Sequence, residues 1–268
     1  MSREEDLNAV ADDLEAEEQV LDDLVASLDD VGWNTATLAE GWTVRDTIGH
    51  LTASEEMASV AASDPDAFAD YLAGVIERLD EFEGGITPDL VPLLNDELLE
   101  QWRRRRRVTI DAVRALGPDA RIPWAGPSMK GRAFLTARLM ETWCHGRDVF
   151  DALGAVAPAT DRLRHVAHLG AVTREFAYAN RGREAPGGDI RIELEPPDGG
   201  EPWTWGPTDA ADRVTGVAED FCLVVTQRRN VADTGLVVEG GAAEDWMTVV
   251  QCFAGPATDP PAPGTRVP

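Results

Sequence analysis

Apolar residues recur at helical spacing through most of the first 154 residues. In the first such stretch, residues 4–28, acidic residues separate apolar positions that fall near every third or fourth place (Leu7, Val10, Leu14, Leu21, Leu24, Leu28). This pattern predicts an amphipathic helix. Similar patterns follow along the chain (43–62, 91–116, 131–153), and a shorter, less regular one covers residues 67–82. Four long amphipathic helices within this length predict a four-helix bundle.

Local signals mark where these helices begin and end. Thr43 and Asp46 have the spacing of a capping box, with Asp in place of the usual Glu, and predict the start of the second helix. Pro65, Gly117 and Gly154 each follow the end of a predicted helix. The helical bundle is therefore expected to occupy residues 1–154.

The pattern changes after residue 155 from nearly continuous helix to a mixture of short elements. Alternating apolar and polar residues predict strands, one of which leads into a helix (189–195, 203–206, 214–228, 236–240). Helical spacing returns on both sides of them (161–180, 242–253). We therefore expect a smaller α+β domain over residues 155–255. Five prolines in the remaining residues 256–268 predict a poorly ordered tail.

The net charge of the chain limits the kinds of molecule that are expected to bind it. The chain has 49 acidic and 24 basic residues and a net charge of −25. Nucleic acids and anionic membranes attract basic surfaces, so this balance argues against both as partners. No apolar stretch approaches the length of a membrane span, and no basic segment followed by an apolar one begins the chain. With only three cysteines, we expect a reduced cytoplasmic protein.

Candidate chemistry gathers on the predicted helix over residues 131–153. Glu141 and His145 are four residues apart, and Asp148 lies three beyond, so all three share one face of a helix that is otherwise strongly apolar. Burying these groups without compensation would cost several kcal/mol, and a metal ion supplies such compensation. His50, in the middle of another predicted helix, offers a third ligand, because helical bundles build metal sites from inward-facing side chains.

This pattern leaves alternatives open. A Glu/His pair at this spacing also occurs on solvated helix faces and in ordinary ion pairs, and spacing alone does not show that two helices face each other. Asp148 could accept a ring N–H from a ligating histidine or pair with Arg147 or Arg138. The run Arg103–Arg107 could be a solvated face paired with acids or could capture an anionic substrate.

Two motifs carry a resemblance to a known family. Residues 41–51 (GWTVRDTIGHL) and 138–148 (RLMETWCHGRD) resemble the mycothiol-dependent maleylpyruvate isomerases, which are DinB-like metal proteins of actinobacteria. The likeness covers about residues 5–154. The second half is similar to the smaller, sterol-carrier-like C-terminal domain of that family. The second motif looks closest to an uncharacterised actinobacterial subfamily, of which some members are labelled wyosine base formation.

The resemblance implies a ligand set and a cosubstrate. The family's His, Glu, His ligands correspond to His50, Glu141 and His145, and three protein ligands leave one position open on a catalytic ion. Zinc suits these donors, with nickel, manganese and iron as alternatives. Mycothiol would be the thiol cosubstrate, because a metal ion lowers the pKa of a bound thiol. Arg228 and Arg229 fall where the family's second domain contributes an arginine.

These observations lead to one functional hypothesis and one alternative. We expect a metal- and mycothiol-dependent isomerase or S-transferase that acts on a small electrophilic molecule, with Arg228, Arg229 and Asp148 as catalytic residues. The alternative is a non-catalytic module whose ion is structural or regulatory. Expected partners are the small-molecule substrate and the thiol, in a monomer or homodimer. The chain's acidity and its few cysteines argue against a third interpretation, an RNA-modification protein with an iron–sulfur centre.

Overall fold

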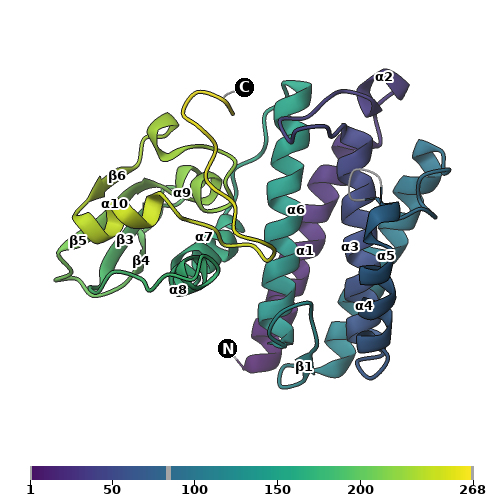
Figure 1. The fold of residues 1–268 in the computed structure, drawn as a ribbon, viewed down its shortest axis with the longest axis horizontal. Coiled ribbons are helices and arrows are strands. Elements are labelled where there is room, and N and C mark those ends of the chain that lie inside the picture. The colour runs from purple at the N-terminus through teal and green to yellow at the C-terminus, as the bar shows by residue number, and fades with distance from the viewer. Residues whose placement is uncertain (1, 83–85, 267–268) are drawn as a thin grey trace. The chain divides into compact units, whose positions relative to one another are not determined.

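The computed structural model describes residues 2–82 and 86–266, which form two compact units divided in sequence between Ala155 and Val156 (Figure 1). Unit 1 is helical apart from a short hairpin, and unit 2 combines helices with a four-stranded sheet. The prediction of a mainly α fold with a smaller α+β part is confirmed. Among the described residues, no helix has both the length and the apolar character needed to cross a membrane.

Unit 1 is built around four long helices, which are α1 (Arg3–Val25), α3 (Val44–Ser63), α5 (Asn95–Leu116) and α6 (Gly131–Leu153). Helix α1 packs along α6, and α3 packs along α5 (Figure 1). Shorter elements connect them, namely α2 (Asp30–Trp33), α4 (Phe68–Glu77), η1 (Leu79–Glu81) and the hairpin strands β1 (Arg121–Ile122) and β2 (Met129–Lys130). The bundle brings residues of α3 and α6 together, although about 90 positions separate them in sequence.

The apolar stripes of these helices form the core of unit 1. One buried cluster joins α1, α3, α5 and α6 (it includes Leu21, Ile48, Leu51, Leu98, Trp102 and Val149). Gly49 permits a close approach on α3, because a Cβ there would lie 2.6 Å from the Ile86 side chain. Gly154 ends α6 in the left-handed region, with φ of 62°, which glycine adopts without a steric penalty. The core therefore decides which face of each helix turns into the bundle.

The predicted start of α3 is confirmed. The Thr43 hydroxyl accepts from the Asp46 backbone N–H at 3.2 Å, and the Asp46 carboxylate accepts from the Thr43 backbone N–H at 2.8 Å. This reciprocal pair satisfies two N–H groups that have no partner within the helix. Val44, the first residue of α3, is fully buried. The cap therefore anchors α3 in the core two turns before His50.

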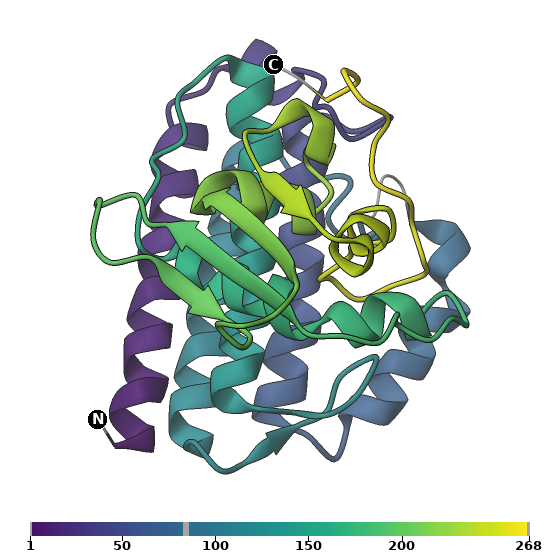
Figure 2. The ribbon, with the colours of Figure 1, turned by 90° about the vertical axis from the view of Figure 1, so that its left-hand side faces the viewer.

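Unit 2 is an α+β unit with a mixed sheet. Its elements are α7 (Leu163–Val172), α8 (Arg174–Ala179), β3 (Ile190–Glu195), β4 (Trp203–Trp205), β5 (Asp212–Val217), α9 (Ala218–Val225), η2 (Val231–Asp233), β6 (Val237–Glu239) and α10 (Gly241–Met247). The strand order is β4-β3-β5-β6; β3 and β5 are parallel and the outer pairs are antiparallel (Figure 2). Ile190, Ile192 and Leu194 of β3 are buried, as the alternating pattern predicts.

The proline-rich tail differs from its expected disorder. It has no regular helix or strand up to residue 266, but amide side chains hold it on unit 2. Gln227 Nε2 donates to the Thr258 carbonyl at 2.8 Å, and Asn230 Nδ2 donates to the Pro261 carbonyl at 2.7 Å. The Thr258 hydroxyl donates to Gln227 Oε1 at 2.8 Å. Prolines lack the N–H that regular structure needs, but carbonyls in this segment still accept hydrogen bonds.

Candidate metal centre

Three of the predicted site residues meet inside unit 1. His50 comes from the middle of α3, and Glu141 and His145 lie one turn apart on α6. One potential ligand atom from each lies within 4.8 Å of the other two. His145 Nε2 is 3.5 Å from Glu141 Oε2, and the two imidazole centroids are 4.7 Å apart. Two imidazoles and a carboxylate therefore converge on one point.

The two ring nitrogens of His145 face different carboxylates. Nε2 faces Glu141, whereas Nδ1 lies 3.6 Å from Asp148 Oδ2. Asp148 is buried on the same helix, one turn further along. A carboxylate at Nδ1 favours a proton on that nitrogen, so a cation held by His145, Glu141 and His50 would replace the proton on Nε2.

An aromatic ring forms one wall of the cluster. The Trp42 ring is stacked on His145, with centroids 5.8 Å apart and planes 14° apart, and its centroid is 5.0 Å from that of His50. Trp42 directly precedes Thr43, so the cap that starts α3 also places this ring. An apolar wall limits solvent beside the polar groups and strengthens their electrostatic interactions.

Charge balance keeps Glu141 ionised. Burial alone would raise the pKa of Glu141, but the hydrogen bond and charge of His145, with the charges of Arg138 and His50, outweigh burial and lower that pKa to about 2. A carboxylate that stays anionic at neutral pH is the form that binds a cation. The donor set, two imidazoles and one carboxylate within bonding reach of a shared ion, fits a zinc-type site with an open position.

Sequence reasoning missed two neighbours of this cluster. Trp42 lies in the first motif, but no role followed from its position. Glu55 is buried on α3 and pairs with Arg138 at 2.8 Å, and a charge inside an otherwise apolar helix face is the sequence signal that points to it. Phe134 and Leu139, by contrast, are fully buried in the core.

Arg228 and Arg229 lie in unit 2, in the loop after α9 (Ala218–Val225). Both are buried, and each donates to a nearby carbonyl, Arg228 to Thr226 and Arg229 to Arg228, at 2.8 Å. The preceding Gln227 has a φ of 58°, a conformation that residues other than glycine rarely adopt. The loop is thus held in a specific, strained form.

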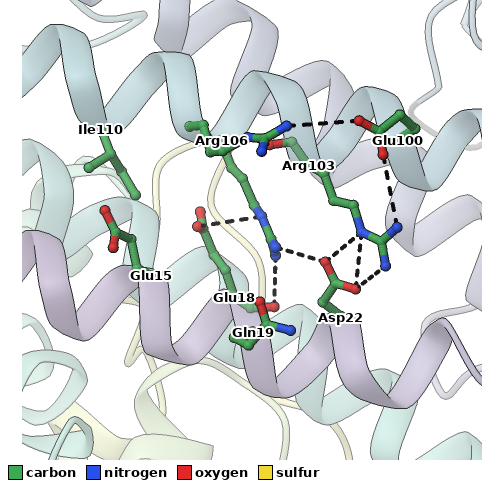
Figure 3. Close-up of a pocket in the computed structure, with 9 residues that line it drawn as sticks. Glu15, Glu18, Gln19, Asp22, Glu100, Arg103, Arg106 and Ile110 are labelled. Atoms are coloured by element: carbon green, nitrogen blue, oxygen red, sulfur yellow. Dashed lines mark hydrogen bonds and ion pairs between the residues drawn. The ribbon is translucent and has the colours of Figure 1, made fainter.

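The arginine run Arg103–Arg107 connects helices. Arg103 and Arg106 both bind Asp22 of α1, at 2.6 and 2.7 Å, and Arg105 binds Glu56 of α3 at 2.6 Å. Arg103 and Arg106 line a cavity of about 480 Å³ between α1 and α5, in which acids of α1 face arginines of α5 (Figure 3). These ion pairs agree with pairing to acids but not with a solvated face, because Arg106 and its partner Asp22 are buried.

Two family models match the chain. The model described as the mycothiol maleylpyruvate isomerase N-terminal domain matches residues 14–150, which include His50, Glu141 and His145. A model described as wyosine base formation matches residues 187–238, within unit 2. The first match covers most of unit 1 and the whole candidate centre.

Two relatives are similar over most of the chain, and two solved structures share its fold. Two curated sequences, each an uncharacterized protein of Mycobacterium tuberculosis (strains CDC 1551 / Oshkosh and H37Rv), are 42% identical over 244 residues, covering 91% of this chain and 95% of the relative. A crystal structure of the mycothiol-dependent maleylpyruvate isomerase has a TM-score of 0.55 at 18% identity, covering 89% of this chain and 95% of that one. A histidine-to-alanine mutant of that isomerase has a TM-score of 0.50 at 18% identity, over 84% and 91%. At this identity the structures show a shared fold.

Proposed function

Because the chain belongs to the mycothiol maleylpyruvate isomerase N-terminal domain family, we propose that it is a cytoplasmic enzyme that uses a divalent metal ion and mycothiol. The reaction class is isomerisation or S-transfer on a small electrophilic molecule. The observation that carries the proposal is the convergence of His50, Glu141 and His145 from two helices that are distant in sequence.

In this proposal His50, Glu141 and His145 hold the ion, and zinc is the ion that these donors suit best. The ion, when bound, lowers the pKa of a thiol placed at its open position. Asp148 Oδ2, 3.6 Å from His145 Nδ1, would favour a proton on that nitrogen and so leave Nε2 for the ion. The Trp42 ring limits water on one side of the site.

Unit 2 would supply positive charge. The thiolate of mycothiol attacks an electrophilic carbon, and negative charge develops on the substrate. Arg228 or Arg229 would stabilise this charge, because a guanidinium offers several N–H donors in a fixed plane. The strained loop conformation at Gln227 supports a functional assignment for these residues, since such conformations concentrate at functional sites.

Cobalt substitution tests the proposal. Co²⁺ bound at the site reports its ligands through visible absorption, so adding mycothiol should change the spectrum as sulfur joins the ion. The disulfide form of the same thiol, which has no sulfhydryl, is the matched control and should leave the spectrum unchanged. A spectrum that does not respond to mycothiol would rule out the thiol-dependent enzyme.

That result would favour the alternative, a non-catalytic module with a structural or regulatory ion. The three-ligand donor set argues against a purely structural ion, because structural zinc usually has four protein ligands. A role in wyosine formation draws on the match at residues 187–238 alone. Three cysteines are too few for a cluster held by four thiolates, so we do not propose that role.

A further inference from the structure

One buried guanidinium joins the two helices that carry the candidate ligands. Arg138 lies on α6, one turn before Glu141, and its side chain crosses to α3. Its Nε donates to Glu55 Oε1 at 2.8 Å, and its Nη1 donates to Ser54 Oγ at 2.9 Å. Ser54 follows His50 by one helical turn. The contact therefore ties α3 to α6 within about one turn of a candidate ligand on each helix.

Net stability is a poor explanation for this pair. The side chains of Arg138 and Glu55 are 3% and 1% exposed, so both charges have lost their hydration. The attraction within a buried ion pair often does no more than offset that loss. Moreover, Arg138 Nη2 and Glu55 Oε2 are buried without a hydrogen-bond partner among the described residues. The pair is better explained by the geometry that it fixes.

A metal centre divided between two helices needs such a constraint. Apolar contacts between α3 and α6 are not directional, so they allow small rotations and translations of one helix along the other. Such shifts would change the separation of His50 from Glu141, whereas a metal site requires its ligands within about half an ångström of their places. A planar guanidinium that binds two successive residues, Ser54 and Glu55, restrains both rotation and translation.

We propose that Arg138 and Glu55 are positioning residues, which hold α3 and α6 at the spacing that lets His50 and Glu141 share one ion. The inference rests on the proposed function only in requiring that the centre binds a divalent cation. It requires neither the thiol nor isomerisation.

The test replaces both charges together, as Glu55→Met with Arg138→Met in the full chain, so that neither is left buried alone. Affinity for Zn²⁺ is measured by competition with a chelator, and Co²⁺ absorption reports the ligand geometry. We expect about 10- to 100-fold weaker binding and an altered Co²⁺ spectrum, the scale typical of lost outer-shell support. Circular dichroism checks that the helices persist.

Arg106→Met is the matched control. Arg106 is also buried in an ion pair, with Asp22 at 2.7 Å, but it joins α5 to α1, neither of which carries a candidate ligand. This variant should lose stability while keeping the wild-type metal affinity and spectrum. If the double variant fails to fold, Ser54→Ala decides instead, because it removes one hydrogen bond and should weaken binding about fivefold.

The outcomes separate this inference from the proposed function. Wild-type affinity and spectrum in the folded double variant would overturn the positioning role. Equal weakening in Arg106→Met would also overturn it, since general loosening of the bundle would then explain the loss. Metal binding without any response to mycothiol would overturn the proposed function and leave the positioning role standing. A wild-type protein that binds no divalent ion would overturn both.

Discussion

At the scale of single residues, His145 has the neighbours that a metal ligand needs. One ring nitrogen faces Glu141, the carboxylate that would share the ion, and the other faces the buried carboxylate of Asp148. Its ring also lies against His50 and Trp42. Removing this one side chain should therefore affect the ion more than the fold.

His145→Ala is expected to lose the ion and keep most of its helix content. The loss of a direct ligand should weaken binding by more than the roughly 100-fold that outer-shell changes cost, whereas packing of the bundle core holds the helices. Metal analysis after dialysis and far-ultraviolet circular dichroism measure the two effects.

His165→Ala, outside the cluster, is the control and should retain the ion. Collapse of helicity in His145→Ala, or in wild-type protein treated with a chelator, would instead indicate a structural ion.

Glu18 is a second residue whose surroundings lead to a testable prediction, here about the pH dependence of stability. Burial raises the pKa of Glu18 well above its usual 4.5, the nearby Glu55 carboxylate raises it further, and Arg106 and Arg138 oppose the rise. Glu18 Oε1 is buried and has no hydrogen-bond partner among the described residues. Between pH 4.5 and the folded-state pKa, folding therefore takes up a proton at this group, and its contribution to stability falls as pH rises.

Glu18→Gln removes that dependence. We therefore expect the free energy of unfolding of the variant to increase relative to that of the wild type as pH rises above 4.5. The increase should be up to about 1.4 kcal/mol per pH unit and should stop once the pH passes the folded-state pKa of Glu18. Urea unfolding at several pH values measures the gain. A difference between Glu18→Gln and wild type that stays constant with pH would contradict the prediction.

At the scale of elements, periodicity located the long helices, and tertiary contacts decided the details. The helix expected over residues 4–28 ends at Val25, and α2 follows separately. The single helix expected over residues 161–180 is divided at Thr173 into α7 and α8. The hairpin of β1 and β2 was not predicted, because two-residue strands carry no periodic signal.

The candidate metal centre also combines features that the sequence predicts with features that only the packing of the helices determines. Spacing on one helix placed Glu141, His145 and Asp148 on a common face, since the helical period alone determines this. The contribution of His50 depends on the packing of α3 against α6, which the bundle pattern and the family resemblance suggested but helical spacing does not determine. The partnership of Arg138 with Glu55 joins residues 83 positions apart, and no local pattern predicts such a pair.

The cap of α3 gives an element-scale prediction. Thr43→Ala should lower the free energy of unfolding by about 1 kcal/mol, because the Asp46 N–H loses its acceptor next to the buried Val44. The double variant with Asp46→Ala should cost less than the sum of the single variants, since the two residues share one reciprocal cap. Urea unfolding measures all three.

Ser2→Ala is the control, because Ser2 and Glu5 form a similar box at the exposed start of α1. It should cost less than Thr43→Ala, since a terminal turn frays without disturbing the core. Equal losses of unfolding free energy in the two variants would show that the cap of α3 contributes no more to stability than the cap of α1.

At the scale of the whole molecule, the proposed chemistry is divided between two units. All three candidate ligands, the Trp42 wall and the Arg138–Glu55 pair belong to unit 1, and the arginines assigned to the substrate's charge belong to unit 2. Unit 1 also has a buried core of its own, built from all four long helices. Metal binding and anion stabilisation should therefore be separable.

A fragment of residues 1–155 tests this separation. It should fold cooperatively, and its affinity for Zn²⁺ should lie within about threefold of that of the full chain, because all three candidate ligands belong to unit 1. Its Co²⁺ form should still respond to mycothiol, because the thiol meets the ion in unit 1. Turnover of an electrophilic substrate should be lost with Arg228 and Arg229.

The same fragment with His145→Ala is the control for specific binding. A folded fragment that binds no ion would show that unit 2 contributes to the centre, and the division of roles proposed here would then be wrong.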